Sequence, residues 1–238
     1  MSGEEKASRL CEARELVREQ NGVKLKKMLS EDPQLVGQKD DSGRLLLHWA
    51  CSVGNVQFVQ LLLDQQSDSL EAEDEMQWTP LMIAASAGHI EVFNYLMSRG
   101  ANPNAQNSTR CTPLHYAASK EHLRIIEKLL SYEGRHGRVD VNAQDHYANT
   151  PLHRAASKGN IKAVQLLLSV PGRCQLNLGD SEGNTALHLA CEEQRDEIAA
   201  ALVKAGAHLD RLNKAEKSPL QLAAPKLRAT LQRLSSTG

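Results

Sequence analysis

The sequence predicts an all-α solenoid built from repeated helix pairs, and two observations lead to this fold class. The first is one six-residue pattern that recurs as LLLHWA from Leu45, TPLMIA from Thr79, TPLHYA from Thr112, TPLHRA from Thr150, TALHLA from Thr185 and SPLQLA from Ser218. The second is the period, because successive copies start 34, 33, 38, 35 and 33 residues apart. A period of this length is typical of small units that bury their apolar faces only by stacking on one another.

Each pattern has the residues that a helix start requires. Thr112 and Thr150 are placed where a side-chain oxygen can cap the helix N-terminus, and Pro113 and Pro151 follow at the first helical position, where a proline costs no hydrogen bond. The pattern and its period resemble those of ankyrin repeats, in which a β-turn precedes two antiparallel helices. The fourth and fifth positions of the pattern are called here the histidine position and the variable position.

A second helix is expected after a Gly-polar turn in each repeat, as at Gly54-Asn55 and Gly159-Asn160. The apolar residues of this helix return at helical spacing and are, in two repeats, Val56, Val59, Leu62, Leu63, Ile161, Val164, Leu167 and Leu168. Both helices of a repeat are short and amphipathic, so neither would be stable alone. Stacking is therefore expected to build one continuous core from nearest-neighbour contacts.

Both ends of the chain have the pattern of capping repeats. An amphipathic helix is expected from Lys6 to Gln20, and a last helix is expected to open at Pro225. We predict a single ankyrin-repeat solenoid over residues 1–238, with seven repeats of which the first and last are degenerate caps. The expected repeats are 6–38, 39–71, 72–105, 106–143, 144–178, 179–211 and 212–238. Extra length is expected as surface loops at 132–138 and 170–175.

Composition excludes several classes of function. The net charge of the 238 residues is −1, so bulk electrostatics favours neither nucleic acid nor a membrane surface as a partner. No apolar run approaches the roughly 20 residues of a membrane-spanning helix, and the first residues lack the apolar stretch of a signal peptide. The five cysteines show no C-x-x-C pairing. A reducing cytoplasmic or nuclear location and a monomeric chain are expected.

The residues give little support for catalysis. Four of the nine histidines occupy the histidine position and are His48, His115, His153 and His188. One histidine per repeat is better explained by hydrogen bonds to the turns than by a metal site, whose ligands must converge at about 2 Å from the ion. No phosphate-binding loop or nucleophile-elbow motif is present. We therefore expect no enzyme, cofactor or metal.

Function is expected on the concave face, where the first helices and the finger-like turns meet a partner. The variable positions carry Trp49, Ile83, Tyr116 and Arg154, the residues soon after them include Ser86, Lys120 and Lys158, and the finger residues include Asp41, Arg44, Asp74, Glu75, Trp78, His146 and Tyr147. Aromatic side chains rimmed by charge are enriched at protein interfaces. For any single charge on a turn, simple solvation is the alternative explanation.

The stretches LHWACSVGN from Leu47, WTPLMIAASAG from Trp78, CTPLHYAASK from Cys111, DHYANTPLHRAASKGN from Asp145 and EGNTALHLACEE from Glu182 together resemble the gankyrin family. That family comprises seven-repeat, non-ATPase proteasome regulatory subunits that act as assembly chaperones. The resemblance implies binding to the C-terminal helical domain of one proteasomal AAA-ATPase subunit. It carries the family's contact residues onto Asp41, Arg44, Asp74, Glu75 and Lys120. As departures from the family, the first finger is expected to hold one extra residue, Gly43, and the loop at 132–138 to be longer.

Three alternatives stay open on sequence grounds. The chain could be an ankyrin adaptor or a kinase-inhibitor-like module with a different partner, or a repeat domain of a larger signalling enzyme. Leu189, Cys191 and Glu193 fit L-x-C-x-E, the ligand pattern of the retinoblastoma pocket, which the animal member of the resembled family shares. That ligand binds in an extended form, whereas these residues fall in an expected first helix, so core packing is the alternative explanation.

Overall fold

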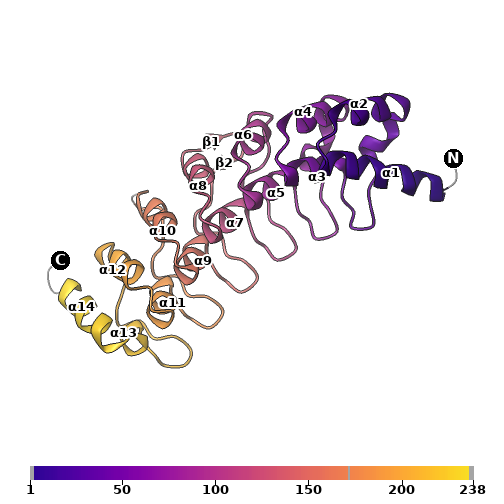
Figure 1. Cartoon of the computed structure of the whole chain (residues 1–238). Coiled ribbons are helices and arrows are strands. Elements are labelled where there is room, and N and C mark those ends of the chain that lie inside the picture. The colour runs from indigo at the N-terminus through magenta and orange to yellow at the C-terminus, as the bar shows by residue number, and fades with distance from the viewer. Residues whose placement is uncertain (1–2, 171, 236–238) are drawn as a thin grey trace. The chain divides into compact units, whose positions relative to one another are not determined.

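The chain folds into two compact units, residues 1–108 and 109–238, each a stack of helix pairs with loops on one side (Figure 1). The computed structural model describes residues 3–170 and 172–235. The predicted all-α repeat architecture is confirmed. The prediction that all seven repeats form one domain stays a prediction.

The first unit holds three helix pairs. Its elements are α1 (Gly3–Arg18), α2 (Gly22–Glu31), the 3-10 turn η1 (Pro33–Gly37), α3 (Leu46–Val53), α4 (Val56–Gln65), the 3-10 turn η2 (Ser67–Glu71), α5 (Pro80–Ala87) and α6 (Ile90–Ser98). The first helices α1, α3 and α5 pack side by side in one row, and α4 packs against α6 in the second row. The expected capping helix is thus α1, which ends two residues earlier than predicted.

The second unit holds four helix pairs and one small hairpin. Its elements are α7 (Pro113–Ser119), α8 (Leu123–Leu130), β1 (Glu133–Gly134), β2 (Gly137–Arg138), α9 (Pro151–Lys158), α10 (Ile161–Leu168), α11 (Ala186–Glu192), α12 (Asp196–Lys204), α13 (Pro219–Leu222) and α14 (Pro225–Ser235). The row α7, α9, α11 and α13 faces the row α8, α10, α12 and α14. The expected start of the last helix at Pro225 is confirmed.

The helix ends follow the predicted chemistry. Thr150 is the N-cap of α9, its hydroxyl accepts a hydrogen bond from the N–H of His153, and Pro151 opens the helix. The same helix ends at Gly159, whose φ of 80° lies in the left-handed region that favours glycine. The helices can therefore stop sharply and reverse within a few residues.

The core of each unit consists mainly of aliphatic side chains, and in the first unit it also contains Phe58 and Phe93. In α7, Leu114 and Ala117 are fully buried, and the second helices contribute residues such as Leu62 and Val164. Alanine at these positions lets neighbouring first helices approach closely. Because each helix pair buries its apolar face only against the next, stability is shared between adjacent repeats.

A five-residue turn, called a finger here, precedes the first helix of every repeat after the first. The fingers are residues 40–44, 74–78, 107–111, 145–149, 180–184 and 213–217, and all have the same length. Gly43 is therefore not an extra residue relative to the other fingers of this chain, and the expected difference from the resembled family stays a prediction. Gly43 instead fills the fourth finger position, where every finger turns with a positive φ, from 55° at Glu216 to 78° at Gly183.

The first residue of each finger is Asp or Asn, and in five of the six fingers its side-chain hydrogen bonds close the turn. In the fingers that begin with Asp40, Asp74, Asp145, Asp180 and Asn213, one side-chain oxygen accepts the backbone N–H groups of the third and fifth finger residues at 2.8–3.0 Å. This is an Asx turn, the local conformation that these side chains favour. It holds each finger rigid in the absence of a core of its own.

Neighbouring fingers within a unit are joined by one backbone hydrogen bond each, a series called the finger ladder here. The N–H of the second finger residue donates to the carbonyl of the third residue of the preceding finger. The pairs are Glu75 to Ser42 and Ser108 to Met76 in the first unit, and His146 to Thr109, Ser181 to Tyr147 and Lys214 to Glu182 in the second unit, at 2.8–3.1 Å. The ladder sets the spacing of the fingers.

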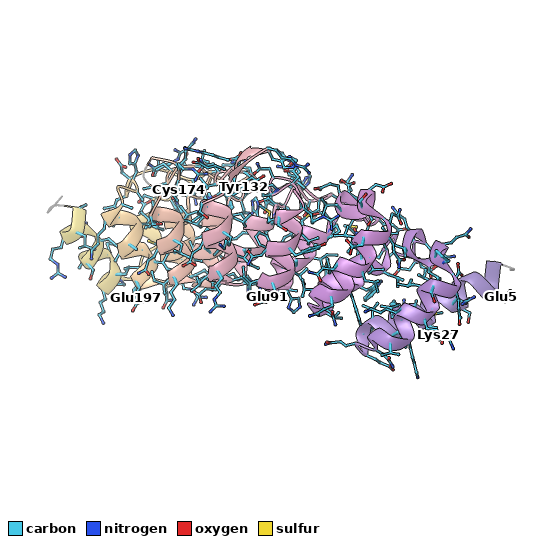
Figure 2. The ribbon with its side chains drawn as sticks, turned by 90° about the horizontal axis from the view of Figure 1, so that it is seen from above. Glu5, Lys27, Glu91, Tyr132, Cys174 and Glu197 are labelled. Atoms are coloured by element: carbon cyan, nitrogen blue, oxygen red, sulfur yellow. The ribbon has the colours of Figure 1, made fainter. Side chains whose placement is uncertain are left out.

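The extra length after α8 forms a hairpin rather than an irregular loop. Strands β1 and β2 pair in antiparallel register, with Glu133 opposite Arg138. Arg173 closes its base by donating to the carbonyls of Leu130 and Val139. In Figure 2, Tyr132 and Cys174 lie along one edge of the second unit, and Glu197, at the start of α12, lies along the other. In the second predicted loop, at 170–175, Pro171 lies outside the described residues.

Ala148 tests the cost of the left-handed finger position. Its φ is 59°, a conformation that costs a residue with a Cβ atom about 1–2 kcal/mol. Ala148→Gly is expected to raise the free energy of unfolding by about 1 kcal/mol, part of the relief being offset by the greater freedom of glycine in the unfolded chain. Ala229→Gly, in the ordinary helical backbone of exposed α14, should lower it by about 1 kcal/mol. A change in the free energy of unfolding that has the same sign in both variants, as measured with urea, would contradict this explanation.

Candidate functional site

The motif histidines act as links between repeats. In the second unit, His115 Nδ1 accepts the N–H of the helix N-cap Thr112 at 3.1 Å, and its Nε2–H donates to the carbonyl of Asn149 in the next finger at 3.0 Å. His153 and His188 make the same two contacts. The backbone N–H can only donate, so each ring is neutral with its proton on Nε2. The structural interpretation of these histidines is confirmed.

In the first unit, Trp49 lies at the centre of a charged cluster. Its indole Nε1–H donates to Asp40 Oδ2 at 2.9 Å, and the guanidinium groups of Arg14 and Arg44 lie 5.4 and 5.5 Å from its ring centroid. Burial opposes ionisation of Asp40, but hydrogen bonds from the Arg44 backbone and the Trp49 indole hold its pKa below the usual value. Trp49 is thus a structural residue of the first finger as well as part of the surface.

The structure places Asp74 inside its finger rather than at the tip. Its side chain is 3% exposed, Oδ1 accepts two backbone N–H groups, and Oδ2 accepts from Arg44 Nε at 2.9 Å. The variable residue above it, Ile83, is 7% exposed and offers no polar group. Both residues therefore contribute little surface to a partner. Their expected contact role stays a prediction, and the acidic surface of this finger consists of its exposed neighbours.

The second unit repeats the Trp49 arrangement with arginine. Arg154 lies nine residues after Asp145, as Trp49 lies nine residues after Asp40, and its guanidinium donates to Asp145 Oδ2 through Nε and Nη2. The pKa of Asp145, which burial would raise, is held below its usual value by this ion pair and by backbone hydrogen bonds. Because the Arg154 side chain is 32% exposed, part of the guanidinium still reaches the surface.

The remaining predicted residues lie at the surface in two groups. Six of them are exposed: Asp41 and Glu75 in the first unit, and Lys120, His146, Tyr147 and Lys158 in the second. Trp78, Ser86 and Tyr116 are half-buried. The side chain of Tyr147 is 64% exposed, and its ring meets the edge of the His146 ring at a centroid distance of 5.6 Å. This tip presents two neighbouring aromatic side chains at the surface.

Three functional features were missed from sequence. Asp40 and Asp145 close their fingers and position the variable residue. A signal was available in the sequence, since Asp or Asn stands five residues before the N-cap of every first helix after α1. Arg14 stacks on Trp49 from a helix without the six-residue pattern, which hid it. Met76, 54% exposed at a finger tip, stands where Tyr147 stands in its own finger and belongs with the candidate surface.

The L-x-C-x-E residues lie within and at the end of α11. Cys191 is fully buried, Leu189 is half-buried, and Glu193 is the exposed C-cap of the helix. This geometry supports core packing, because an extended ligand would require α11 to unwind. Within residues 3–170 and 172–235, no group of three or more His, Cys, Asp or Glu side chains is arranged to hold a metal ion. The same part of the chain has no helix long and apolar enough to cross a membrane.

Comparison with known protein families matches most of the chain to one repeat type. A model of three ankyrin repeats matches residues 15–107 and 100–178, and a model of a single ankyrin repeat matches residues 182–214. These segments include the fingers and the helix pairs described above.

Individual relatives match shorter stretches. The 26S proteasome non-ATPase regulatory subunit 10 of Dictyostelium discoideum is 34% identical over 97 residues, 41% of this chain and 37% of its own. A probable 26S proteasome regulatory subunit p28 of Saccharomyces cerevisiae is 33% identical over 88 residues, 36% of this chain and 39% of its own. An ankyrin repeat-containing protein of Schizosaccharomyces pombe is 45% identical over 56 residues, 24% of each chain. The matched part thus spans between 24% and 39% of these relatives.

The neutral histidines predict that stability falls in acid. Burial lowers the pKa of His115 from 6.5 to about 4, so between these pH values the unfolded chain binds a proton that the folded chain excludes. Stability should be fully present above pH 6.5 and lost as the pH falls towards 4, by about 2–3 kcal/mol for this residue.

His115→Gln provides the matched variant. Gln221 occupies the histidine position of the last repeat, where its Oε1 accepts the N–H of Ser218 at 2.8 Å, so glutamine can replace the cap without titrating. The variant should lose stability more slowly than the parent between pH 6.5 and 4. Asp145 and Arg154, which act on His115, stay charged over this range and are unchanged in the comparison. The free energy of unfolding of both proteins is measured with urea at several pH values. An identical dependence of this free energy on pH in the two proteins would contradict the prediction.

Proposed function

Because the chain belongs to the ankyrin-repeat family, whose repeats bind other proteins, we propose that it is a non-catalytic chaperone for assembly of the proteasome regulatory particle base. It holds the C-terminal helical domain of one AAA-ATPase subunit against its variable positions and finger tips. The observation that carries this proposal is the similarity to proteasome regulatory subunits of two organisms at 33–34% identity. It acts as a monomer in the cytoplasm and nucleus.

The chemistry of the surface supports a protein partner with mixed charges. In the first unit, exposed Asp41 and Glu75 lie on the first two fingers, Met76 lies at the tip of the second, and exposed Glu73 directly precedes that finger. In the second unit, exposed Lys120 and Lys158 end the first helices, close in sequence to the half-buried variable residues. Aromatic and aliphatic anchors within alternating charge suit a partner that is read along its length.

Binding to each proteasomal ATPase provides the direct test. The full-length protein is immobilised and challenged separately with the C-terminal domain of every ATPase subunit of the proteasome base. Retention of one domain and not of the others is expected. Failure to retain any of them, with the circular dichroism of the folded protein intact, would overturn the proposal.

A second candidate is an adaptor or inhibitor module for a different protein. The observation in its favour is that ankyrin proteins of other functions match as well, among them a human protein phosphatase 1 regulatory subunit, 42% identical over 66 residues. The same surface would then serve another client. If another cellular protein co-purifies with the chain and proteasome base subunits do not, this candidate is favoured.

Tyr116 should matter to binding more than to folding. It is half-buried at a variable position, whereas Leu114 in the same helix is fully buried. Tyr116→Ala is expected to weaken binding by about 2 kcal/mol while changing the free energy of unfolding little. Leu114→Ala should instead cost about 2–5 kcal/mol of stability through the cavity it leaves. Calorimetric titration and urea unfolding of both variants separate the two effects. A Tyr116→Ala protein that is destabilised but binds the partner with unaltered affinity would contradict the assignment.

Charge reversal tests the acidic finger. Glu73 and Glu75 are exposed, so reversing both to lysine leaves the Asp74 turn in place and adds repulsion toward a basic partner. Binding to the ATPase domain should weaken by several kcal/mol, about 2–5. The loss should shrink at 1 M salt, where the Debye length is about 3 Å. The control is Asp68→Lys with Glu91→Lys, an equal charge change on η2 and α6, which should leave affinity nearly unchanged.

A further inference from the structure

The finger ladder is open at its first member. In each later finger the N–H of the second residue donates to the preceding finger, as Glu75 does to Ser42. Asp41 holds this position in the first finger, but the described residues before it, 3–37, form α1, α2 and η1 and contain no finger. Among the described residues, no acceptor for the Asp41 N–H is present. An unpaired backbone N–H in the finger ladder can donate a hydrogen bond to the backbone of another chain.

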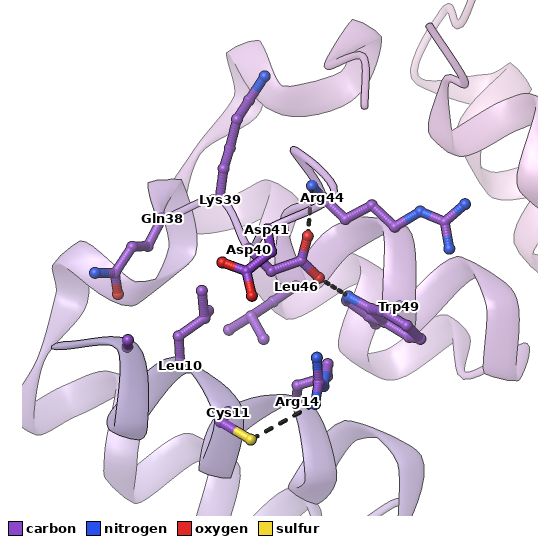
Figure 3. Close-up of a pocket in the computed structure, with 11 residues that line it drawn as sticks. Leu10, Cys11, Arg14, Gln38, Lys39, Asp40, Asp41, Arg44, Leu46 and Trp49 are labelled. Carbon is purple, nitrogen blue, oxygen red and sulfur yellow. Dashed lines mark hydrogen bonds between the residues drawn. The ribbon is translucent and has the colours of Figure 1, made fainter. Parts of the chain in front are cut away.

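A pocket of about 260 Å³ lies beside this open end, between α1 and the first finger (Figure 3). Its walls include Leu10 and Arg14 of α1 and Asp41 of the finger, with Leu46 and Trp49 of α3 between them. By the register of the ladder, the N–H of Asp41 is directed toward the side of the preceding repeat. The pocket therefore lies where a finger of the first repeat would otherwise lie.

The polar groups of the pocket differ in how fully they are paired. Arg44 donates to Asp74 at 2.9 Å, and Lys39 donates to the Glu73 carbonyl at 3.0 Å. The two carboxylate oxygens of Asp40 accept three N–H groups, so this anion has strong partners of its own. These groups have little capacity left for a ligand.

Arg14 is the exception among these cations. Its direct contacts are a 3.5 Å hydrogen bond to Cys11 Sγ, a 3.7 Å ion pair with Glu15 and the face of Trp49, and its buried Nε lacks a hydrogen-bond partner in the described structure. Its charge also acts on the nearby Asp40 carboxylate without a direct hydrogen bond. Glu15 is shared with Arg18. A guanidinium held this weakly can form a bidentate pair with an incoming carboxylate.

We propose that this pocket binds an extended segment of the protein partner, which adds to the finger ladder in place of the missing finger. A backbone carbonyl of the segment accepts the Asp41 N–H, an aliphatic side chain packs on Leu10, Leu46 and Trp49, and an acidic side chain pairs with Arg14. The inference rests on the proposed function as a protein binder and names the part of the partner that this site recognises. Main-chain pairing supplies affinity, and the Arg14 pair supplies specificity.

Proline at position 41 isolates the main-chain bond. The Gly43 N–H donates to the Asp40 carbonyl, which makes residue 41 the second residue of a β-turn, a position that proline favours. Asp41→Pro therefore removes the donor while keeping the turn. Asp41→Ala is the matched control, since it removes the carboxylate but keeps the N–H.

The probe is the acetylated and amidated pentapeptide Val-Glu-Val-Leu-Gly, compared with its glutamine analogue, on the full-length ¹⁵N-labelled protein. Addition of the acidic peptide should move the Asp41 amide resonance downfield and slow its hydrogen exchange. The glutamine analogue, or Arg14→Met with the acidic peptide, should bind about two- to fivefold more weakly. Asp41→Pro should also lose about two- to tenfold in affinity, the value of one hydrogen bond. Asp41→Ala should bind at least as tightly as the parent.

Each outcome decides the inference separately from the proposed function. An Asp41 amide that neither peptide moves, or equal affinity of the two peptides, overturns the pocket assignment even if a proteasomal ATPase domain binds elsewhere. Peptide binding that is weakened by Asp41→Pro and by Arg14→Met supports the assignment even if every ATPase domain fails to bind. If Asp41→Pro changes the free energy of unfolding in urea, the test is made with Arg14→Met instead, which alters the opposite wall of the pocket.

Discussion

In five of the six fingers, the side-chain oxygen at the start of the finger accepts two backbone N–H groups, and the rest of the structure depends on this turn. A finger has no apolar core, so its backbone groups would otherwise be left to water. Closing it places the N-cap of the following helix, the carbonyl that the preceding histidine reaches, and the N–H that continues the ladder. Helix start, repeat spacing and surface presentation are therefore consequences of one local hydrogen-bond pattern.

The second oxygen of the same carboxylate connects this turn to the binding surface. This oxygen accepts a hydrogen bond from Trp49 at Asp40 and from Arg44 at Asp74. At Asp145 it accepts one from Arg154. These side chains cannot be judged by surface exposure alone, because removing one leaves a buried carboxylate oxygen without its donor. A loss of binding in such a variant has to be separated from a loss of the finger.

The charges on the surface consequently fall into two classes. Asp74 and Arg154 have internal partners and contribute mainly to stability, whereas Glu75, Lys120 and Lys158 are exposed. Exposed pairs are individually weak, at about 0–1 kcal/mol each, so selectivity for a partner must come from several of them together with the aromatic anchors. Tyr147 at one tip and Met76 at another are anchors of this kind.

The sequence by itself determined the repeat fold, the helix starts and the structural role of the histidines. These features are local: a threonine cap, a proline at the first turn and a 33–38-residue period act within a repeat or on its neighbour, so one chain reveals them. Only the tertiary structure decided that Asp74 faces inward, that Arg14 stacks on Trp49, and that the first finger leaves the Asp41 N–H without an acceptor. Those outcomes depend on which side chains meet across repeats some 30 residues apart, and periodicity places such residues on the same face without telling which of them pair.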